Sequence, residues 1–183
     1  MGEVILDRAE LIRRLEQHRA RGERIVLTNG AFDIIHVGHV RCLRDCANHG
    51  PVLVVALNSD ASVRAYKGDG RPINPEAERA EVIAAFCGVT YVTLFDEPTA
   101  DAILEQLRPD VHAKGRDYTD AEQAVVEEGT EAARRRQASR PVPEMETARR
   151  LGIEIAIVGD PKNHSTSWIL EKMGGEGGSA KGG

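Results

Sequence analysis

The sequence predicts an α/β fold built on a doubly wound sheet of five parallel strands with helices on both faces. Short apolar runs alternate along the chain with segments of helical spacing, which is the pattern of parallel strands joined by helices. Most of these runs end in a cluster of polar residues or glycine. Because open α/β sheets bind ligands at the carboxyl ends of their strands, we expect these clusters to converge at one edge of the sheet.

The strands are predicted by short runs rich in β-branched residues and bounded by polar turns. Their length suits strands rather than helices, and the continuous apolar character of the longest runs indicates burial on both faces. In chain order they span residues 24–28, 52–57, 89–95, 111–113 and 153–158.

The helices are predicted from apolar spacing and from cap residues. Asp7 and Glu10 form a capping-box pattern before the first helix, and Ser59 can cap a later one. Asn74 before Pro75 predicts a cap followed by proline in the first turn. In chain order the helical segments span 7–22, 39–49 and 61–66, one that begins at 75, and then 99–107, 121–136, 143–150 and 168–173.

Length and composition limit the remaining possibilities. The 183 residues suffice for one domain, so we expect a single domain over residues 1–173 and a disordered glycine-rich tail over 174–183. The 24 basic and 29 acidic residues give a net charge of −5, which argues against a nucleic-acid partner. No apolar run reaches transmembrane length, and residues 1–21 are charged and amphipathic. We therefore expect no membrane partner and a cytoplasmic location.

The stretch from Thr28 to His39 joins a strand end, a glycine turn, two histidines and a helix start. Gly30 permits a tight turn and close backbone approach to a ligand, and Gly38 keeps the helix entrance free of side-chain bulk. His36 and His39 then lie near a helix N-terminus, where unpaired N–H groups and the helix dipole favour an anion. A nucleoside triphosphate suits such a pocket.

Further polar clusters follow other predicted strands. Residues 58–60 follow the second strand, 114–118 the fourth and 159–167 the fifth. The basic, glycine-rich loop over residues 67–72 can hold a phosphate. The run Arg134–Arg136 is interpreted as part of a solvated helix or loop, because the chain as a whole is acidic.

Cysteine usage gives no disulfide framework, since the chain has three cysteines, Cys42, Cys46 and Cys87. His39, Cys42, Cys46 and His49 have residue types that zinc prefers and nearly share one helix face. A single straight helix cannot wrap all four around one ion, because the outer pair are ~15 Å apart. We therefore predict no metal site there, and interpret Cys42 and Cys46 as small core-facing hydrophobes.

The pattern His36-Val37-Gly38-His39, preceded by Gly30-Ala31-Phe32-Asp33, resembles the HxGH signature of the nucleotidyltransferase superfamily. Over about residues 8–172 the chain is similar to the heptose 1-phosphate adenylyltransferase family. The matching motifs are residues 28–39, 58–60, 67–75, Arg79, 114–115, 117–118 and 165–166. The sequence departs from that family at Arg116, where glycine is usual, between Tyr118 and Pro143, and over residues 159–164.

This resemblance implies a Rossmann-like sheet and a reaction of ATP with a heptose 1-phosphate to give ADP-heptose and pyrophosphate. Attack by a sugar phosphate oxygen on the α-phosphate needs no covalent protein nucleophile, but it needs two anions to be held together and charge on the pyrophosphate to be neutralised. We expect Mg²⁺ to complete the site. We also expect the protein to form a homodimer. Cationic and hydrogen-bond donors should therefore dominate the site.

The candidate site residues fall into three groups. The expected catalytic residues are His36, His39 and Lys114. The expected nucleotide-binding residues are Thr28, Asn29, Gly30, Ala31, Phe32, His36, His39, Asn58, Asp60, Gly115, Asp117, Ser165, Thr166 and Ser167. The expected substrate-binding residues are Asp33, Lys67, Arg71 and Arg79.

Alternatives remain open. The first alternative function is that of a CTP-dependent cytidylyltransferase acting on glycerol 3-phosphate or a related polyol phosphate. That family has an arginine where this chain has Asp160. A non-catalytic nucleotide-binding regulatory domain would keep the glycine turn but need not keep both histidines and Lys114. Lys67 and Arg71 can also be solvated loop charges, and Arg79 can pair with a neighbouring glutamate.

Overall fold

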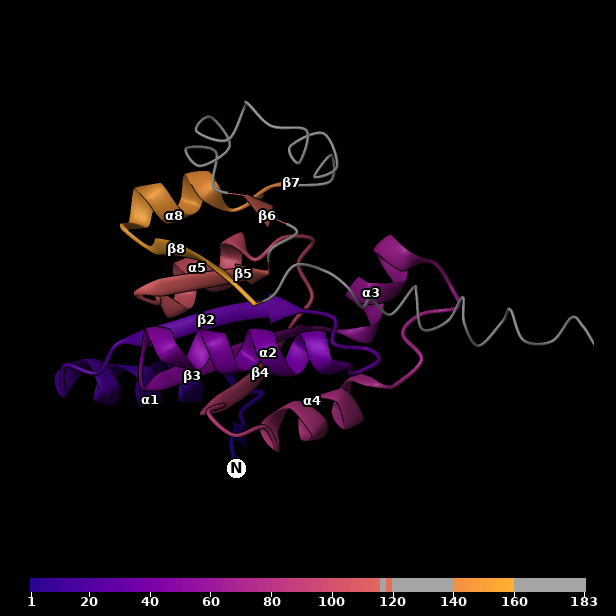
Figure 1. The fold of residues 1–183 in the computed structure, drawn as a ribbon, viewed down its shortest axis with the longest axis horizontal. Helices are drawn as coiled ribbons and strands as arrows, with labels where there is room; N and C mark the ends of the chain where they lie inside the picture. The colour runs from indigo at the N-terminus through magenta and orange to yellow at the C-terminus, as the bar shows by residue number, and fades with distance from the viewer. Residues whose placement is uncertain (116–117, 120–139, 160–183) are drawn as a thin grey trace, which may run out of the picture.

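The computed structural model describes residues 1–115, 118–119 and 140–159, and its centre is a parallel sheet between two layers of helices (Figure 1). Six strands lie in the order β1-β4-β3-β2-β5-β8. Their bounds are β1 Glu3–Val4, β2 Ile25–Gly30, β3 Val52–Asn58, β4 Tyr91–Phe95, β5 Val111–Gly115 and β8 Glu154–Val158. The predicted doubly wound α/β class is confirmed, with one more strand than predicted.

The additional strand, β1, pairs in parallel with β4 at the edge of the sheet. It has two residues, Glu3 and Val4, both exposed. The apolar run at residues 4–6 is too short to show the alternation of a strand, so the sequence pattern did not predict β1. A separate parallel pair, β6 (Tyr118–Thr119) with β7 (Arg140–Pro141), was likewise not predicted.

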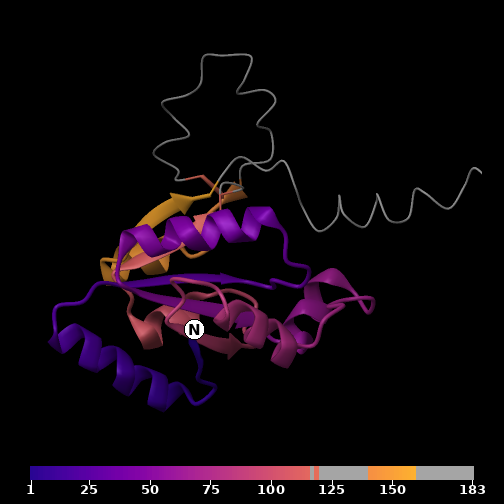
Figure 2. The ribbon, with the colours of Figure 1, turned by 60° about the horizontal axis from the view of Figure 1, so that its bottom comes forward.

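Helices cover both faces of the sheet. α1 (Arg8–Ala20), α5 (Asp101–Leu107) and α8 (Met145–Leu151) share one apolar core with β2, β3 and β4. α2 (Val37–Cys46) and α4 (Glu76–Ala84) share the other, and Figure 2 shows α1 and α2 on opposite sides of the sheet. A short helix, α3 (Asp60–Lys67), follows β3, and a 3₁₀ turn, η1 (Ala47–His49), follows α2.

Strand β2 lies at the position where the chain order of the sheet reverses. Thr28 pairs with Val55 of β3 on one side and with Ala113 of β5 on the other. All these pairings are parallel, so the strands end at the same edge of the sheet. Folds of this kind bind ligands at the carboxyl edge of the sheet, at the point of reversal.

The predicted capping box before α1 is half formed. Asp7 Oδ1 accepts hydrogen bonds from the N–H groups of Ala9 and Glu10, at 2.9 and 3.4 Å, which confirms the cap. The Glu10 carboxylate does not return to the backbone; it pairs instead with Arg13 and Arg14 one turn further along the helix. Two arginines at helical spacing outcompete the reciprocal bond.

The cap of α3 is as predicted, since Ser59 Oγ accepts from the N–H of Ser62 at 3.1 Å. The predicted cap of α4 is wrong. Pro75 occupies the cap position without a side-chain hydrogen bond. The Asn74 amide donates instead to the carbonyl oxygen of Asp33, so it ties this loop to the glycine turn.

In the part of the chain that is described, no helix combines the length and the apolar character needed to cross a membrane. The helices expected over 121–136 and 168–173, the run Arg134–Arg136, the domain boundary at 173 and the tail 174–183 lie outside the described residues.

Candidate active site

The glycine turn after β2 has its left-handed residue at Phe32, with φ of 46°, and not at Gly30. A side chain other than glycine is strained there, and such strain is held only where surrounding packing fixes it. The Phe32 ring is buried, and a Cβ on Gly30 would lie 3.1 Å from it. The Phe32 ring therefore packs against Gly30 and leaves little room for a side chain there. The approach of a ligand to the Gly30 backbone stays a prediction.

His36 and His39 cap the start of α2 reciprocally. The N–H of Gly38 donates to His36 Nδ1 at 3.2 Å, and the N–H of His36 donates to His39 Nδ1 at 3.3 Å. The two rings stack with centroids 3.9 Å apart, and the Phe32 ring lies 5.1 Å from that of His39. The sequence analysis placed both histidines at this helix start, but it did not foresee that they form the cap themselves.

This arrangement fixes the proton on each ring. A backbone N–H can only donate, so Nδ1 of each histidine is an acceptor and the neutral ring carries its proton on Nε2. Each histidine therefore presents an Nε2–H donor at a helix N-terminus. Two such donors beside the positive end of the helix dipole form a suitable site for phosphate oxygens.

Lys114 lies at the end of β5 and is almost fully buried. Its Nζ donates to Asn29 Oδ1 at 2.9 Å and pairs with Glu144 Oε2 at 2.8 Å. His112 Nε2 lies 3.1 Å from the same Asn29 oxygen. A lysine ammonium can only donate, so the atom that it contacts must be the Asn29 oxygen, and the two amide protons of Asn29 point away from the lysine.

His112 is completely buried two residues before Lys114. Burial, and to a lesser degree the charge of Lys114, hold the pKa of His112 well below its usual value. The ring is therefore neutral and donates from Nε2 to Asn29. One positive charge, that of Lys114, thus stands at this strand end rather than two.

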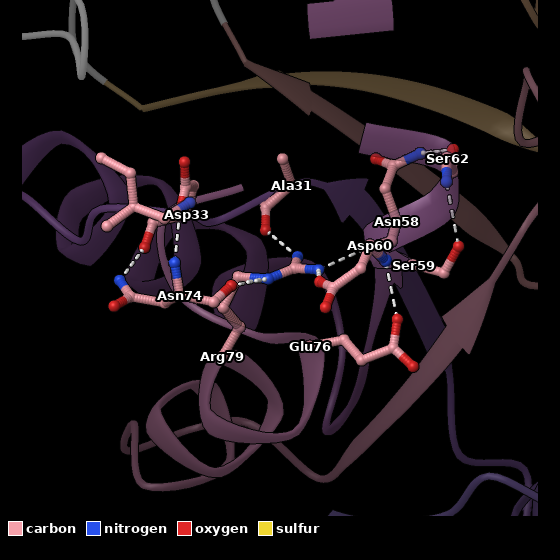
Figure 3. A network of polar contacts seen from close by, with 10 residues as sticks. Ala31, Asp33, Asn58, Ser59, Asp60, Ser62, Asn74, Glu76 and Arg79 are labelled. Atoms are coloured by element: carbon pink, nitrogen blue, oxygen red, sulfur yellow. Dashed lines mark hydrogen bonds and ion pairs between the residues drawn. The ribbon is translucent and has the colours of Figure 1, made fainter. Parts of the chain in front are cut away.

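Arg79 of α4 is fully buried and braces three segments, as Figure 3 shows. Its Nε donates to Asn74 O at 3.0 Å, one Nη donates to Ala31 O, and the other donates to Asn58 O at 2.9 Å and to Asp60 Oδ1 at 2.8 Å. Four protein acceptors thus occupy the guanidinium. In this structure Arg79 holds the glycine turn, the end of β3 and the loop before α4 together.

Asp33 forms a second brace beside it. Its carboxylate accepts from Arg71 Nη1 at 2.6 Å and from the N–H groups of Ile73 and Asn74 at 2.8 and 3.0 Å. Burial alone would raise the pKa of Asp33, but the hydrogen bonds from Asn74, Arg71 and Ile73 outweigh it and lower the pKa. Asp33 is therefore ionised and pins the Arg71 side chain to the glycine turn.

The sheet edge gathers most of the predicted residues that are described. Thr28 to Gly30 end β2 and are followed by Ala31 and Phe32. Asn58 ends β3, Asp60 starts α3, and Lys114 and Gly115 end β5. Lys67 is exposed, with its ammonium 5.5 Å from the centroid of the Tyr66 ring. Asp117, Ser165, Thr166, Ser167 and the comparison position Asp160 lie outside the described residues.

Glu144 and His112 were not predicted as part of the site. A histidine inside an apolar strand is a visible signal for His112, because an unpaired polar ring is costly in a sheet core. Glu144 has no such signal, since its partner Lys114 lies in a different predicted element. Only the folding of the chain, which places the start of α8 beside the end of β5, brings the Glu144 carboxylate to the site.

Cys46 belongs to the core beneath α2, as predicted, and Cys42 packs beside it. A hydrogen bond with the Cys42 thiol, together with burial, raises the pKa of Cys46.

Among the described residues, no group of three or more histidine, cysteine or acidic side chains is arranged to hold a metal ion. Three carboxylates at the site form ion pairs: Asp33 with Arg71, Asp60 with Arg79 and Glu144 with Lys114.

Comparisons with known proteins agree with this geometry. The family model described as cytidylyltransferase-like matches residues 27–172. Bifunctional protein HldE of Geobacter metallireducens is 52% identical over 105 residues, which are 57% of this chain and 21% of the relative. HldE of Pseudomonas paraeruginosa is 40% identical over 169 residues, which are 92% of this chain and 32% of the relative. The chain thus spans between a fifth and a third of the length of these curated relatives.

Two solved structures share the fold. A lipopolysaccharide core biosynthesis protein from Thermoplasma volcanium has a TM-score of 0.54 at 22% identity, and the match covers 77% of this chain and 100% of that one. Pantothenate synthetase from Thermus thermophilus has a TM-score of 0.53 at 16% identity, covering 90% of this chain and 63% of that one. At these identities the likeness concerns the fold alone.

Proposed function

The chain belongs to the cytidylyltransferase-like family, a family of nucleotidyltransferases, and from this premise we propose that it joins the α-phosphate of ATP to a sugar 1-phosphate. The proposed acceptor is a heptose 1-phosphate and the proposed product is ADP-heptose. An oxygen of the sugar phosphate attacks the α-phosphorus, the bond to the bridging oxygen breaks, and pyrophosphate leaves with the electron pair. The motif similarity to heptose 1-phosphate adenylyltransferases and the HldE relatives support this choice.

The observation that carries the proposal is the reciprocal cap made by the two histidines. It directs two Nε2–H donors from the start of α2, where the helix dipole favours the charge that develops on the leaving pyrophosphate. His36 and His39 are held by the backbone, so they need little reorganisation during the reaction. Lys114, whose ammonium is paired with Glu144, adds a cationic hydrogen-bond donor at the neighbouring strand end.

The nucleotide is proposed to lie along the carboxyl ends of β2, β3 and β5. Backbone and side-chain groups from Thr28 to Phe32, with Asn58, Asp60 and Gly115, are its proposed contacts. The proposal includes Asp117 and residues 165–167 as further nucleotide contacts, on the basis of the motif similarity.

The acceptor phosphate is proposed to bind Lys67 and Arg71, next to Asp33. Arg71 is partly exposed and is held in place by the Asp33 carboxylate, so its guanidinium can accept an anion with little loss of side-chain freedom. Arg79 was expected to bind this phosphate as well. Since the side chain is buried and four of its five N–H donors bond to protein groups, we assign it a bracing role instead.

Mg²⁺ is proposed to enter with the triphosphate. Mg²⁺ keeps several waters and binds through substrate phosphates in many such sites, so it does not require a cage of carboxylates. When bound, it would screen the negative charge of the phosphates. The described residues offer no dedicated set of ligands to it.

Pyrophosphate release with ATP or CTP and a panel of phosphates tests the proposal. The panel includes heptose 1-phosphate, hexose 1-phosphates and glycerol 3-phosphate. The expected result is the highest kcat/KM for ATP with heptose 1-phosphate. A preference for CTP with glycerol 3-phosphate would replace it by the cytidylyltransferase alternative, and nucleotide binding without turnover on any acceptor would support a regulatory domain.

The acceptor site is tested separately by Arg71→Ala. We expect KM for the sugar phosphate to rise far more than KM for ATP. Arg64→Ala, which removes an exposed arginine of α3, is the matched control and should change neither. Equal effects of Arg71→Ala on both substrates would remove Arg71 from the acceptor site.

A further inference from the structure

Glu144 is a buried carboxylate to which the proposed reaction gives no role. It lies directly before α8 and is 2% exposed. Its Oε2 is 2.8 Å from the Lys114 ammonium, which is itself 4% exposed. A charged pair buried to this degree has lost nearly all contact with water, so each partner depends on the other for its charge.

The two oxygens of the Glu144 carboxylate have different contacts, and the contact of Oε2 with Lys114 is an ion pair without hydrogen-bond geometry. While Oε2 faces Lys114, Oε1 accepts a hydrogen bond at 3.1 Å from the N–H of Ala100, a fully buried residue at the start of α5. On the far side of the ammonium, Nζ donates to Asn29 Oδ1 at 2.9 Å. The Lys114 head group is thus held between β2 and the starts of α5 and α8.

We propose that Glu144 is a positioning residue, which keeps Lys114 charged and directed toward the phosphates at the carboxyl ends of β2 and β5. This inference rests on the proposed function, in which Lys114 binds a phosphate group. Burial without an anion would favour the neutral amine, because a low dielectric disfavours the charged form. Among the contacts given for the described residues, the groups near the ammonium are Glu144 before α8, the neutral amide of Asn29 on β2 and the neutral ring of His112 on β5 itself.

Stability alone does not account for such a pair. Replacing a buried ion pair by apolar side chains of similar volume is often neutral or stabilising, because the charges no longer need to be desolvated. The pair therefore has its main effect on the state of Lys114. A stabilising anion beside a catalytic cation also fixes the direction in which that cation points, and small misplacements of catalytic groups are costly.

Glu144→Gln is the informative variant. Glutamine keeps an oxygen for the Ala100 N–H and removes the charge opposite Lys114. We expect kcat to fall roughly ten- to a hundredfold with little change in KM for ATP, and the alkaline limb of the pH profile to move to lower pH. Glu144→Asp keeps the charge and should recover part of the loss.

Glu105→Gln is the matched control. Glu105 pairs with Arg150 between the same two helices, α5 and α8, but this pair is exposed. Its loss should leave kcat and the pH profile unchanged, because exposed pairs contribute little.

A second pair of variants covers the case in which Glu144→Gln does not fold. Lys114→Met alone is compared with Lys114→Met combined with Glu144→Met, which replaces the whole pair by apolar side chains. If Glu144 acts through Lys114, the double variant has the same kcat as the single one. A further loss in the double variant would show a merely structural role and overturn the inference.

The outcomes separate this inference from the proposed function. Full turnover in Lys114→Met would remove Lys114 from the proposed mechanism. An inactive Lys114→Met beside a folded, fully active Glu144→Gln would leave the mechanism standing and overturn the role of Glu144. Nitrogen-15 NMR of the Lys114 ammonium needs no substrate: its pKa should fall in Glu144→Gln, and an unchanged pKa would contradict the inference.

Discussion

The two histidines at the start of α2 illustrate how closely local structure and chemistry are joined at the scale of single residues. Because their Nδ1 atoms accept backbone N–H groups, their neutral rings carry the proton on Nε2. We predict that His36→Ala and His39→Ala each lower kcat by about a hundredfold or more, the typical cost of losing one transition-state donor. Steady-state kinetics on folded variants would measure this.

Two controls separate the ring donor from the helix cap. His36→Asn keeps a good cap residue but removes Nε2, so it should lose as much activity as His36→Ala. His49 lies in η1, after the C-terminal end of α2, so His49→Ala should leave kcat unchanged. Activity restored by His36→Asn would mean that the cap matters and the ring donor does not.

Asp33 gives a prediction about pH. Its pKa is lowered from 3.8, so its contribution to stability is fully present above that value and is lost as the pH falls through the lower folded pKa. Asp33→Asn should therefore be less stable than wild type at about pH 7, and the gap should narrow below about pH 4. Urea unfolding across this range would measure the gap, and a gap of constant size would contradict the assignment.

At this scale the sequence predicted residues that sit within one motif and missed the pairings between motifs. The Thr28–His39 stretch was recognised because its chemistry and its spacing are local. The actual partners of Arg79 and Lys114 come from segments far away in the chain, and no local pattern reveals them. For Arg79, the sequence suggested a glutamate or a substrate phosphate, whereas the structure pairs it with Asp60 and three carbonyl oxygens.

Among the elements, α4 contributes the Arg79 side chain that ties the glycine turn to β3 and to its own start (Figure 3). We predict that Arg79→Met lowers the free energy of unfolding by about 3 kcal/mol or more, because the carbonyl oxygens of Ala31, Asn58 and Asn74 and the carboxylate of Asp60 lose their donor. Chemical denaturation would measure this loss. Arg64→Met, on the exposed surface of α3, should stay within about 0.5 kcal/mol of wild type.

The kinetic pattern of a milder variant tests the bracing role. Arg79→Lys keeps the charge but cannot supply the guanidinium fork, so the segments that it joins should loosen together. KM should then rise for both substrates. A rise confined to the sugar phosphate, in a variant of wild-type stability, would return Arg79 to the acceptor site.

Strands and helices with strong patterns were predicted well, and the weak elements were not. All five predicted strands are present, since a buried apolar run is a strong signal. β1 was missed because two exposed residues form it through pairing with β4. The cap at Asn74 was wrong because a tertiary partner, Asp33, takes the side chain that local sequence assigned to the helix.

For the whole molecule, the parallel sheet determines where chemistry can occur. The strand order places β2 between β3 and β5. The polar residues at the carboxyl ends of these three strands therefore lie at one edge of the sheet. The sequence predicted this convergence from the alternation of elements alone. The strand order does not specify the acceptor: Lys67 ends α3, and Arg71 lies on the loop after it, where contacts between distant segments fix Arg71 and Ile73 to Asp33.

The most direct test of the central claim follows the two ends of the triphosphate. With heptose 1-phosphate as acceptor, label from ATP at the α-phosphate should appear in the sugar nucleotide, and label at the γ-phosphate should appear in pyrophosphate. His39→Ala should slow the appearance of both labels by the same factor, because the same bond between the α-phosphorus and the bridging oxygen is broken in both cases. Transfer of the γ-label to the sugar would instead indicate a kinase and would contradict the account.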